Sequence, residues 1–167
     1  GNGENALYLS KKYPNKLIIT SDIYEDGNFN LCEQLKKKKI DNVKIFNQNV
    51  LILFERFKLN NLIKEIWILF PDPWQKTKHY KRRLINLAFV KKISLSLYKN
   101  SKIYIVTDCT SYFISILKVF YISKLFKWIN DLPYKWNYSS NFYNKTKYFE
   151  KALRNKKKAF ILIFQKI

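Results

Sequence analysis

The stretch that most constrains the fold is an apolar run that two prolines bring to an end. Residues 67–70, Trp-Ile-Leu-Phe, are apolar and include β-branched and aromatic side chains, which predicts a buried strand. Pro71 and Pro73 end this strand, because proline has no N–H to donate to a neighbouring strand. Each proline also restricts the residue before it, so Asp72 is held in a narrow conformational range. The sequence therefore places one stiffly held carboxylate at the mouth of a buried strand.

A basic and aromatic loop follows this turn. Residues 75–83 read Gln-Lys-Thr-Lys-His-Tyr-Lys-Arg-Arg, in a chain with 32 Lys and Arg, 12 Asp and Glu and a formal net charge of +20. This excess favours a nucleic-acid partner, although AT-biased coding also produces a composition rich in lysine and asparagine. We expect the loop to contact RNA. The candidate contacts are Lys78, His79, Lys81, Arg82 and Arg83.

Length and cysteine usage narrow the class of protein. At 167 residues we expect a single domain over 1–167. Cys32 and Cys109 lie far apart and without metal-ligand spacing, so we predict no metal site and no disulfide, which fits a reducing cytoplasm. Apolar stretches are too short to span a membrane, so we expect a soluble protein. The chain begins at Gly1 and has 0 Met, so we expect residues upstream of it.

Strand and helix patterns alternate along the chain. The predicted strands cover 16–23, 43–46, 65–70, 102–107 and 159–165. The predicted helices cover 4–12, 28–39, 82–97 and 112–123, and residues 146–154 form a short helix or an ordered loop. Periodicity fades over 124–144, where aromatic side chains either stack on bases or pack in the core. The alternation predicts an α/β fold with a mostly parallel sheet and helices on both faces.

Three acids follow predicted strands directly, namely Asp22, Asp72 and Asp108. Ligands of parallel α/β sheets bind outside the carboxyl ends of the strands, so these acids are site candidates, although Asp is also common at turns and helix caps. Gly1 and Gly3 precede the first helix, where backbone amides of a tight turn can approach a ligand. An acid about 20 residues later, such as Asp22, suits a ribose hydroxyl.

The residues around Asp72 resemble a known family signature. Residues 70–84 are similar to the segment of bacterial tRNA (guanine-N7)-methyltransferases in which Phe-Pro-Asp-Pro-Trp is followed by Lys, a basic residue, His and Lys-Arg-Arg. Other segments agree with the family in their order along the chain. These are Gly1-Asn2-Gly3-Glu4, Ser21-Asp22-Ile23, Thr107-Asp108, and Thr146-Lys147-Tyr148 with Glu150.

The resemblance implies a Rossmann-like class I methyltransferase fold whose first strand lies upstream of Gly1. It implies transfer of a methyl group from S-adenosylmethionine to guanine 46 of the tRNA variable loop, with Asp72 as the catalytic residue. The implied cofactor-binding residues are Gly1, Gly3, Asp22, Asn49 and Asp72. The implied substrate-binding residues are Lys76, Asp108, Thr146, Lys147, Tyr148 and Glu150.

Methylation at nitrogen 7 of guanine is a reaction that one fixed carboxylate can assist. Ring nitrogen 7 carries a lone pair and needs no general base, so alignment with the methyl group supplies most of the rate. The product is a cationic purine, which the carboxylate of Asp72 can stabilise or hold by hydrogen bonds. Lys76 and the other loop cations suit phosphates, and Trp74 or His79 suits stacking on an unpaired base.

The chain departs from the family pattern at two places. Asn49 stands where the family has an acid that contacts the adenine amino group, although its carbonyl can still accept that hydrogen bond. Phe149 stands where the family has Glu, with Glu150 one residue later. Two alternatives follow: a degenerate or truncated relative that binds RNA without catalysis, and an adenine amino-methyltransferase, whose Asp-Pro-Pro-aromatic turn only partly matches 71–74. Monomer and homodimer both remain open.

Overall fold

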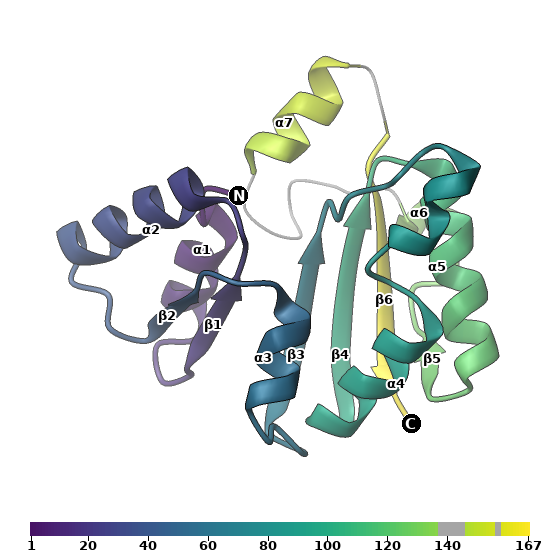
Figure 1. Cartoon of the computed structure of the whole chain (residues 1–167), viewed down its shortest axis with the longest axis horizontal. Coiled ribbons are helices and arrows are strands. Elements are labelled where there is room, and N and C mark those ends of the chain that lie inside the picture. The colour runs from purple at the N-terminus through teal and green to yellow at the C-terminus, as the bar shows by residue number, and fades with distance from the viewer. Residues whose placement is uncertain (137–145, 156–157) are drawn as a thin grey trace. The chain divides into compact units, whose positions relative to one another are not determined.

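The computed structural model describes residues 1–136, 146–155 and 158–167 (Figure 1). These residues form two units. Unit 1 comprises Gly1–Phe57 and the described part of Ser140–Glu150, and unit 2 comprises the described parts of Lys58–Ser139 and Lys151–Ile167. The single domain over 1–167 stays a prediction. Within the described ranges, no helix combines the length and the apolar character that crossing a bilayer requires.

Unit 1 is built on a pair of parallel strands. β1 (Ile18–Ser21) and β2 (Val43–Phe46) run side by side. The helices of this unit are α1 (Glu4–Lys12), α2 (Glu25–Lys37) and α3 (Val50–Arg56). Ala6, Leu31, Leu35 and Val43 form its buried apolar cluster. The helix predicted over 4–12 and the strand predicted over 43–46 are confirmed with the same bounds. The strand predicted over 16–23 is shorter at both ends, and the helix predicted over 28–39 begins three residues and ends two residues earlier.

Unit 2 contains a four-stranded sheet in the order β3-β4-β6-β5. Its strands are β3 (Ile63–Leu69), β4 (Leu97–Thr107), β5 (Phe126–Trp128) and β6 (Phe160–Lys166). β3 and β4 are parallel, whereas β6 pairs antiparallel with both β4 and β5. The parallel β3–β4 pair places the loops that follow these two strands at the same edge of the sheet.

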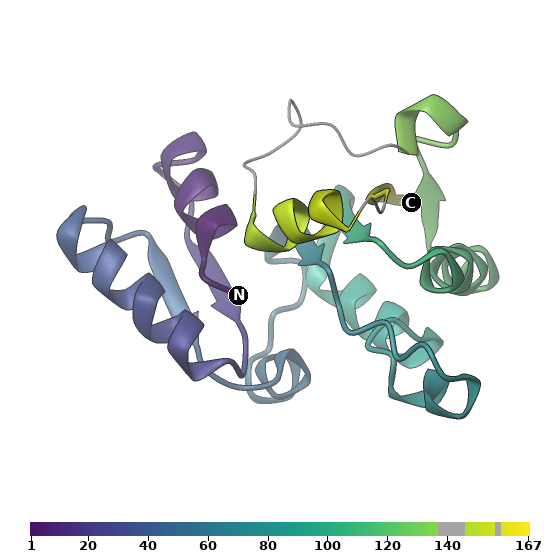
Figure 2. The same cartoon turned by 90° about the horizontal axis from the view of Figure 1, so that it is seen from above.

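Helices of unit 2 alternate with its strands along the chain. They are the 3₁₀ helix η1 (Thr77–Arg82), α4 (Leu87–Ser96), α5 (Thr110–Ser123) and α6 (Pro133–Trp136). α4 and α5 lie side by side along the same face (Figure 1, Figure 2). The ring of Phe120 in α5 stacks on Phe164 in β6, with centroids 3.8 Å apart. α7 (Lys147–Arg154) has residues in both units, and the expected alternative of a loop at 146–154 is not observed.

The helix predicted over 82–97 is shorter in the structure. α4 begins at Leu87, because the side chain of Asn86 accepts a hydrogen bond from the Phe89 N–H at 3.0 Å and caps the helix. Ile85 precedes the helix, yet it is 2% exposed and belongs to the core. The four-residue apolar repeat therefore predicted the core positions correctly and the start of the helix wrongly.

Asn130 organises part of the segment in which the sequence shows no periodicity, of which residues 137–144 lie outside the described part of the chain. Its side chain is 5% exposed. Its Oδ1 accepts hydrogen bonds from Trp128 Nε1 and from the Ile163 N–H, both at 2.8 Å. Its Nδ2 donates to the carbonyls of Ile161 at 2.9 Å and Lys135 at 3.2 Å. One buried amide thus joins β5 and α6 to β6.

Replacing this amide tests its contribution to the fold. We expect Asn130→Ala to lower the free energy of unfolding by at least about 2 kcal/mol, since it leaves several buried polar groups without a partner. Urea denaturation followed by circular dichroism measures the change. Asn60→Ala, at an exposed asparagine, is the control and should change stability by less than about 0.5 kcal/mol. Equal stability of the two variants would contradict the role of Asn130.

Candidate active site

The turn that carries Asp72 is conformationally strained on both sides. The Phe70 N–H donates to the Val106 carbonyl at 2.8 Å, which extends the β3–β4 ladder by one residue. Phe70 and Trp74 then adopt φ values of 49° and 42°, a left-handed region that bulky residues rarely occupy. The Asp72 carboxylate between them is exposed. A turn of this kind persists only where neighbouring groups hold it in place.

An open pocket lies at this turn. It has a volume of about 240 Å³ and is lined by Asp72, Pro73 and Trp74. The volume lies just below the range for small-molecule sites, which is roughly 300–1,000 Å³. The pocket therefore offers a carboxylate and an aromatic ring to a small planar group.

The buried side chain of Arg83 contacts this turn. Arg83 is 3% exposed, and its Nε donates to the Pro73 carbonyl at 2.9 Å. Its Nη2 donates to Ser111 Oγ at 3.0 Å and its Nη1 to the Ser111 carbonyl at 3.3 Å. The guanidinium carbon lies 3.6 Å from the ring centroid of Tyr80 and 4.8 Å from that of Tyr112. Arg83 was expected to contact RNA, and here its N–H groups bond within unit 2.

The other basic residues of the loop are more accessible. Lys76, Lys78, Lys81 and Arg82 are exposed, and His79 is half-buried. The Arg82 guanidinium carbon lies 4.9 Å from the Trp74 ring centroid. The ring of His79 meets that of Trp74 edge-on, with centroids 5.8 Å apart. The loop therefore presents cations to solvent, and the Trp74 ring contacts two of its residues, Arg82 and His79.

Asp108 leaves the sheet at the same edge as Asp72. It follows β4 directly and is half-buried. Next to it, Thr107 Oγ1 accepts a hydrogen bond from the Cys109 N–H at 3.2 Å, and α5 begins at Thr110. The predicted placement of these two acids at the carboxyl ends of adjacent parallel strands is confirmed within unit 2.

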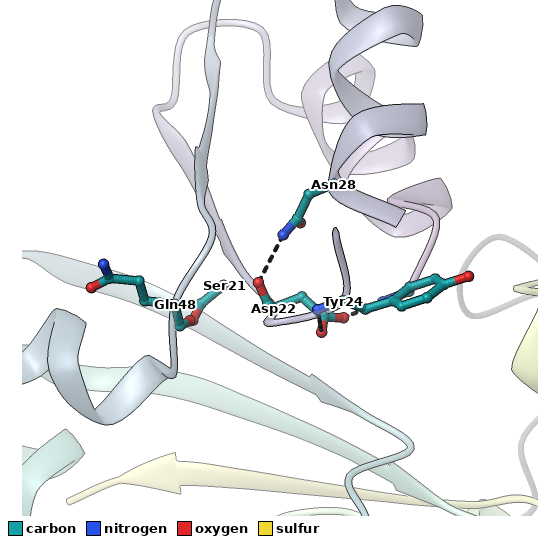
Figure 3. Close-up of polar contacts among 6 residues, drawn as sticks. Ser21, Asp22, Tyr24, Asn28 and Gln48 are labelled. Carbon is teal, nitrogen blue, oxygen red and sulfur yellow. Dashed lines mark hydrogen bonds and ion pairs between the residues drawn. The ribbon is translucent and has the colours of Figure 1, made fainter. Parts of the chain in front are cut away.

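Asp22 of unit 1 follows β1 and is held at several atoms. Its Oδ1 accepts a hydrogen bond from the Tyr24 N–H at 3.0 Å, and its Oδ2 contacts the Gly1 amino nitrogen. The carbonyl oxygen of Asp22 accepts a hydrogen bond from Asn28 Nδ2 at 2.8 Å (Figure 3). The carboxylate is 37% exposed. Asp22 is thus fixed in orientation and still reachable by a ligand.

The glycine turn is closely packed beside Asp22. A Cβ at Gly27 would lie 2.3 Å from the Gly1 carbonyl oxygen, so a larger residue there would displace the turn. Gly3 has φ 77°, and a Cβ on it would lie 2.6 Å from Leu31. Gly1 also lies near Tyr148, because a Cβ on it would lie 3.4 Å from that ring. The chain therefore requires glycine at positions 3 and 27 for two reasons: conformation at the first and close approach at the second.

The loop after β2 is tied to β1 and ends at a helix cap. Ser21 Oγ donates to the Gln48 carbonyl at 2.8 Å, and both residues appear in Figure 3. The exposed Asn49 accepts a hydrogen bond from the Leu51 N–H at 2.9 Å through its Oδ1 and caps α3. The carbonyl expected to accept from adenine therefore already has one donor. An amide oxygen has two lone pairs, so it can accept a second hydrogen bond.

The C-terminal candidates lie at the start of α7. Thr146 is 5% exposed, and its Oγ1 accepts a hydrogen bond from the Phe149 N–H at 3.2 Å. Phe149 is 4% exposed, so the residue at the family's Glu position is buried. Lys147, Tyr148 and Glu150 are exposed. Of this segment, the structure accounts for Thr146 as a helix cap and leaves three side chains accessible to a substrate.

Sequence reasoning missed the residues that hold the Asp72 turn and Asp22 in place. Ser111, Tyr112 and Asn28 contribute side chains to these networks, and none lies in a recognisable motif. No pattern distinguishes Arg83 from the adjacent Arg82, because burial depends on contacts with a distant helix. Across the described part of the chain, no group of three or more His, Cys, Asp or Glu residues could hold a metal ion.

Tyr112, which contacts Arg83, has a perturbed pKa. It is fully buried, and its hydroxyl oxygen accepts a hydrogen bond from the Ile85 N–H at 3.1 Å. Burial raises the pKa of Tyr112 above 10.0, and the negative charge of Asp72 acts in the same direction. The Ile85 N–H and the Arg83 charge oppose these effects in part. Tyr112 is therefore neutral at neutral pH.

The raised pKa predicts how stability changes in alkali. Above about pH 10 an unfolded tyrosine ionises while buried Tyr112 stays neutral, so the free energy of unfolding falls as the pH rises further. We expect Tyr112→Phe to be less stable by about 1–3 kcal/mol at pH 8, where the Ile85 N–H loses its acceptor. The gap to the wild type should narrow as the pH rises above about 10, because the phenylalanine variant lacks this ionisation.

Urea denaturation at several pH values measures this gap. Tyr121→Phe, at a side chain that is 85% exposed, is the matched control and should stay within about 0.5 kcal/mol of the wild type at pH 8. A difference in stability between wild type and Tyr112→Phe that stays constant across the alkaline range would contradict the raised pKa of Tyr112.

Comparisons with known proteins identify the family. The family model Methyltransf_4, described as "Putative methyltransferase", matches residues 1–162. A tRNA (guanine-N(7)-)-methyltransferase of Wolbachia pipientis wMel is 32% identical over 158 residues, which are 95% of this chain and 68% of that protein. The protein of the same name from Neorickettsia sennetsu is 35% identical over 112 residues, which are 67% of this chain and 51% of that protein. The matched segment thus spans about half the length of the second relative.

Solved structures agree with the predicted fold class. An antibiotic-related methyltransferase has a TM-score of 0.66 at 19% identity, with 100% of this chain and 84% of that chain covered. An rRNA methylase from Streptococcus thermophilus has a TM-score of 0.63 at 15% identity, with 100% and 82% covered. These likenesses confirm an α/β fold of the Rossmann-like class I methyltransferase type. With its signature turn and its relatives, the chain belongs to the tRNA (guanine-N7)-methyltransferase family.

Proposed function

We propose that the protein transfers a methyl group from S-adenosylmethionine to nitrogen 7 of guanine 46 in the variable loop of cytoplasmic tRNA. The observation that carries this proposal is the strained turn of unit 2, which exposes the Asp72 carboxylate in an open pocket directly before a basic loop. Membership of the family and the names of the relatives support the reaction.

The residues of unit 1 fit the adenosyl part of the cofactor. The Asp22 carboxylate is a suitable acceptor for ribose hydroxyls, because it is partly exposed and oriented by the Tyr24 N–H. Gly1 and Gly3 carry no side chains of their own, so their backbone is open to the cofactor, and the turn packs against the side chains of Leu31 and Tyr148. Asn49 keeps one lone pair for the adenine amino group. When bound, the cofactor supplies an electrophilic methyl group on a sulfonium.

In this proposal, Asp72 stabilises the positive charge of the purine and orients the guanine. Nitrogen 7 of guanine needs no deprotonation, so the chain does not have to provide a general base. The purine gains positive charge as it accepts the methyl group, and a fixed carboxylate stabilises that charge more in the transition state than in the ground state. The Asp72 carboxylate, exposed at the pocket, also accepts hydrogen bonds from the guanine edge.

The basic loop supplies the RNA side of the proposed site. Lys76, Lys78, Lys81 and Arg82 are free to neutralise phosphates, since their side chains are exposed. His79 and Trp74 offer rings to an unstacked base. We also propose substrate contacts for the remaining candidates of the family pattern. These are Asp108, Thr146, Lys147, Tyr148 and Glu150.

A second function is an RNA-binding relative that has lost catalysis. The observations that favour it are the Asn49 oxygen, which is already engaged as a helix cap, and the buried Phe149 in place of the family's acid. Cofactor binding separates the two functions. Isothermal titration calorimetry of the full-length protein that shows tRNA binding and no S-adenosylmethionine binding would favour the non-catalytic function.

The role of Asp72 is tested by Asp72→Asn and Asp72→Ala. We expect kcat for methyl transfer to fall by roughly 100-fold or more in both variants, because each removes the charge that stabilises the cationic purine. Transfer of labelled methyl groups to unmodified tRNA measures the rate, and mapping of the product identifies the base. Asp131→Asn, an exposed acid of unit 2, is the control and should retain the wild-type rate. Undiminished transfer by Asp72→Ala would exclude the proposed role.

The role of Asp22 is tested by Asp22→Asn. We expect the dissociation constant for S-adenosylmethionine to rise by about tenfold or more, since hydrogen bonds to a charged acceptor are worth roughly 1.5–3 kcal/mol. Affinity for tRNA should stay unchanged. Calorimetry measures both, with Asp41→Asn at an exposed acid as the control. Unaltered cofactor affinity in Asp22→Asn would remove this residue from the site.

A further inference from the structure

We propose that Arg83 is a positioning residue that braces the Asp72 turn against the start of α5. The catalytic consequence rests on the proposed function, whereas the brace itself is a property of unit 2. Arg83 was expected to contact RNA together with its neighbours in the loop. Its burial and its hydrogen bonds indicate that its task differs from that of the adjacent Arg82.

One end of the brace lies inside the strained turn. Phe70 and Trp74 both have left-handed φ values, and the Pro73 carbonyl lies between Asp72 and Trp74. This carbonyl accepts the Arg83 Nε–H at 2.9 Å. Because left-handed backbone is unfavourable for bulky residues, the turn relaxes toward other conformations when this hydrogen bond is lost.

The other end of the brace lies on α5. Ser111, in the first turn of that helix, accepts from Nη2 through its hydroxyl at 3.0 Å and from Nη1 through its carbonyl at 3.3 Å. α5 follows β4 and Asp108, so a single planar group connects the loops that leave β3 and β4. The separation of these two loops is therefore set by a rigid guanidinium.

The surroundings of Arg83 hold its plane in place. Its guanidinium carbon lies 3.6 Å from the Tyr80 ring centroid and 4.8 Å from that of buried Tyr112. Only 3% of Arg83 is exposed, so phosphates have little access to it, whereas Arg82 is exposed. Lysine cannot replace Arg83, because an ammonium group has no planar fork to reach Pro73 and Ser111 at once.

The test compares Arg83→Lys with Arg82→Ala in the full-length protein. Hydrogen–deuterium exchange of the amides at Asp72, Trp74 and 110–112 reports on the brace, steady-state kinetics separates kcat from KM for tRNA, and tRNA binding is measured at several salt concentrations. All kinetic measurements use conditions in which circular dichroism shows each variant to be folded.

We expect Arg83→Lys to accelerate exchange at Asp72 and Trp74 and to lower kcat by roughly 100-fold, as a misplaced catalytic group would. The KM for tRNA and the salt dependence of binding should stay within about twofold of the wild type, because no phosphate contact is lost. Arg82→Ala should instead weaken tRNA binding and make the slope of log K against log salt shallower by about 1, with exchange at Asp72 unchanged.

Ser111→Ala keeps the test decisive if Arg83→Lys does not fold. It removes one acceptor on α5 and leaves the Pro73 contact, so exchange at Trp74 and kcat should change in the same direction by a smaller factor. The proposal would be overturned if Arg83→Lys kept the wild-type exchange and kcat. It would also be overturned if Arg83→Lys lost tRNA affinity and salt slope as Arg82→Ala does, or if exchange were unchanged in Ser111→Ala. If the wild type transfers no methyl group, the proposed function fails, and the exchange comparison still decides on the brace.

Discussion

The hydrogen bond from Arg83 Nε to the Pro73 carbonyl is the interaction on which the architecture around Asp72 depends. The prolines fix their own φ angles, but they do not decide where the turn lies relative to the rest of the sheet. With left-handed backbone at Phe70 and Trp74, the turn has no stable conformation of its own. The buried guanidinium supplies the missing contact, so the position of an exposed carboxylate depends on a side chain that solvent barely reaches.

The Asp22 site of unit 1 shows the same principle with different groups. Here the acid is fixed by the Tyr24 N–H, by Asn28 and by the close approach of the Gly1 turn to Gly27. In both units a carboxylate at the end of a parallel strand is partly or fully exposed, whereas the atoms that orient it are packed. Such an arrangement leaves the acid free for a ligand and holds its direction before the ligand binds.

Local pattern and long-range packing contributed differently to what could be predicted. The strand at 43–46 agrees with β2 at both ends, because alternation with turn residues is a local property. The predicted start of α4 was wrong, because the Asn86 side chain caps the helix and makes it begin later in the chain than the apolar repeat suggested. Asn130 could not be found at all, since two of its partners, Ile161 and Ile163, lie 31 and 33 residues away and meet it only in the folded sheet.

The sequence by itself determined the alternation of strands and helices, the placement of acids directly after strands, and the family, through the Pro-Asp-Pro-Trp turn with its basic loop. These features are encoded by residues that are neighbours in the chain. Only the tertiary structure decided that Arg82 is exposed and Arg83 buried, and that Ser111 and Tyr112 belong to the Asp72 network. The physical reason is that the burial of an arginine depends on which oxygen atoms and rings the fold brings to it, and among these Ser111 lies 28 residues away on α5.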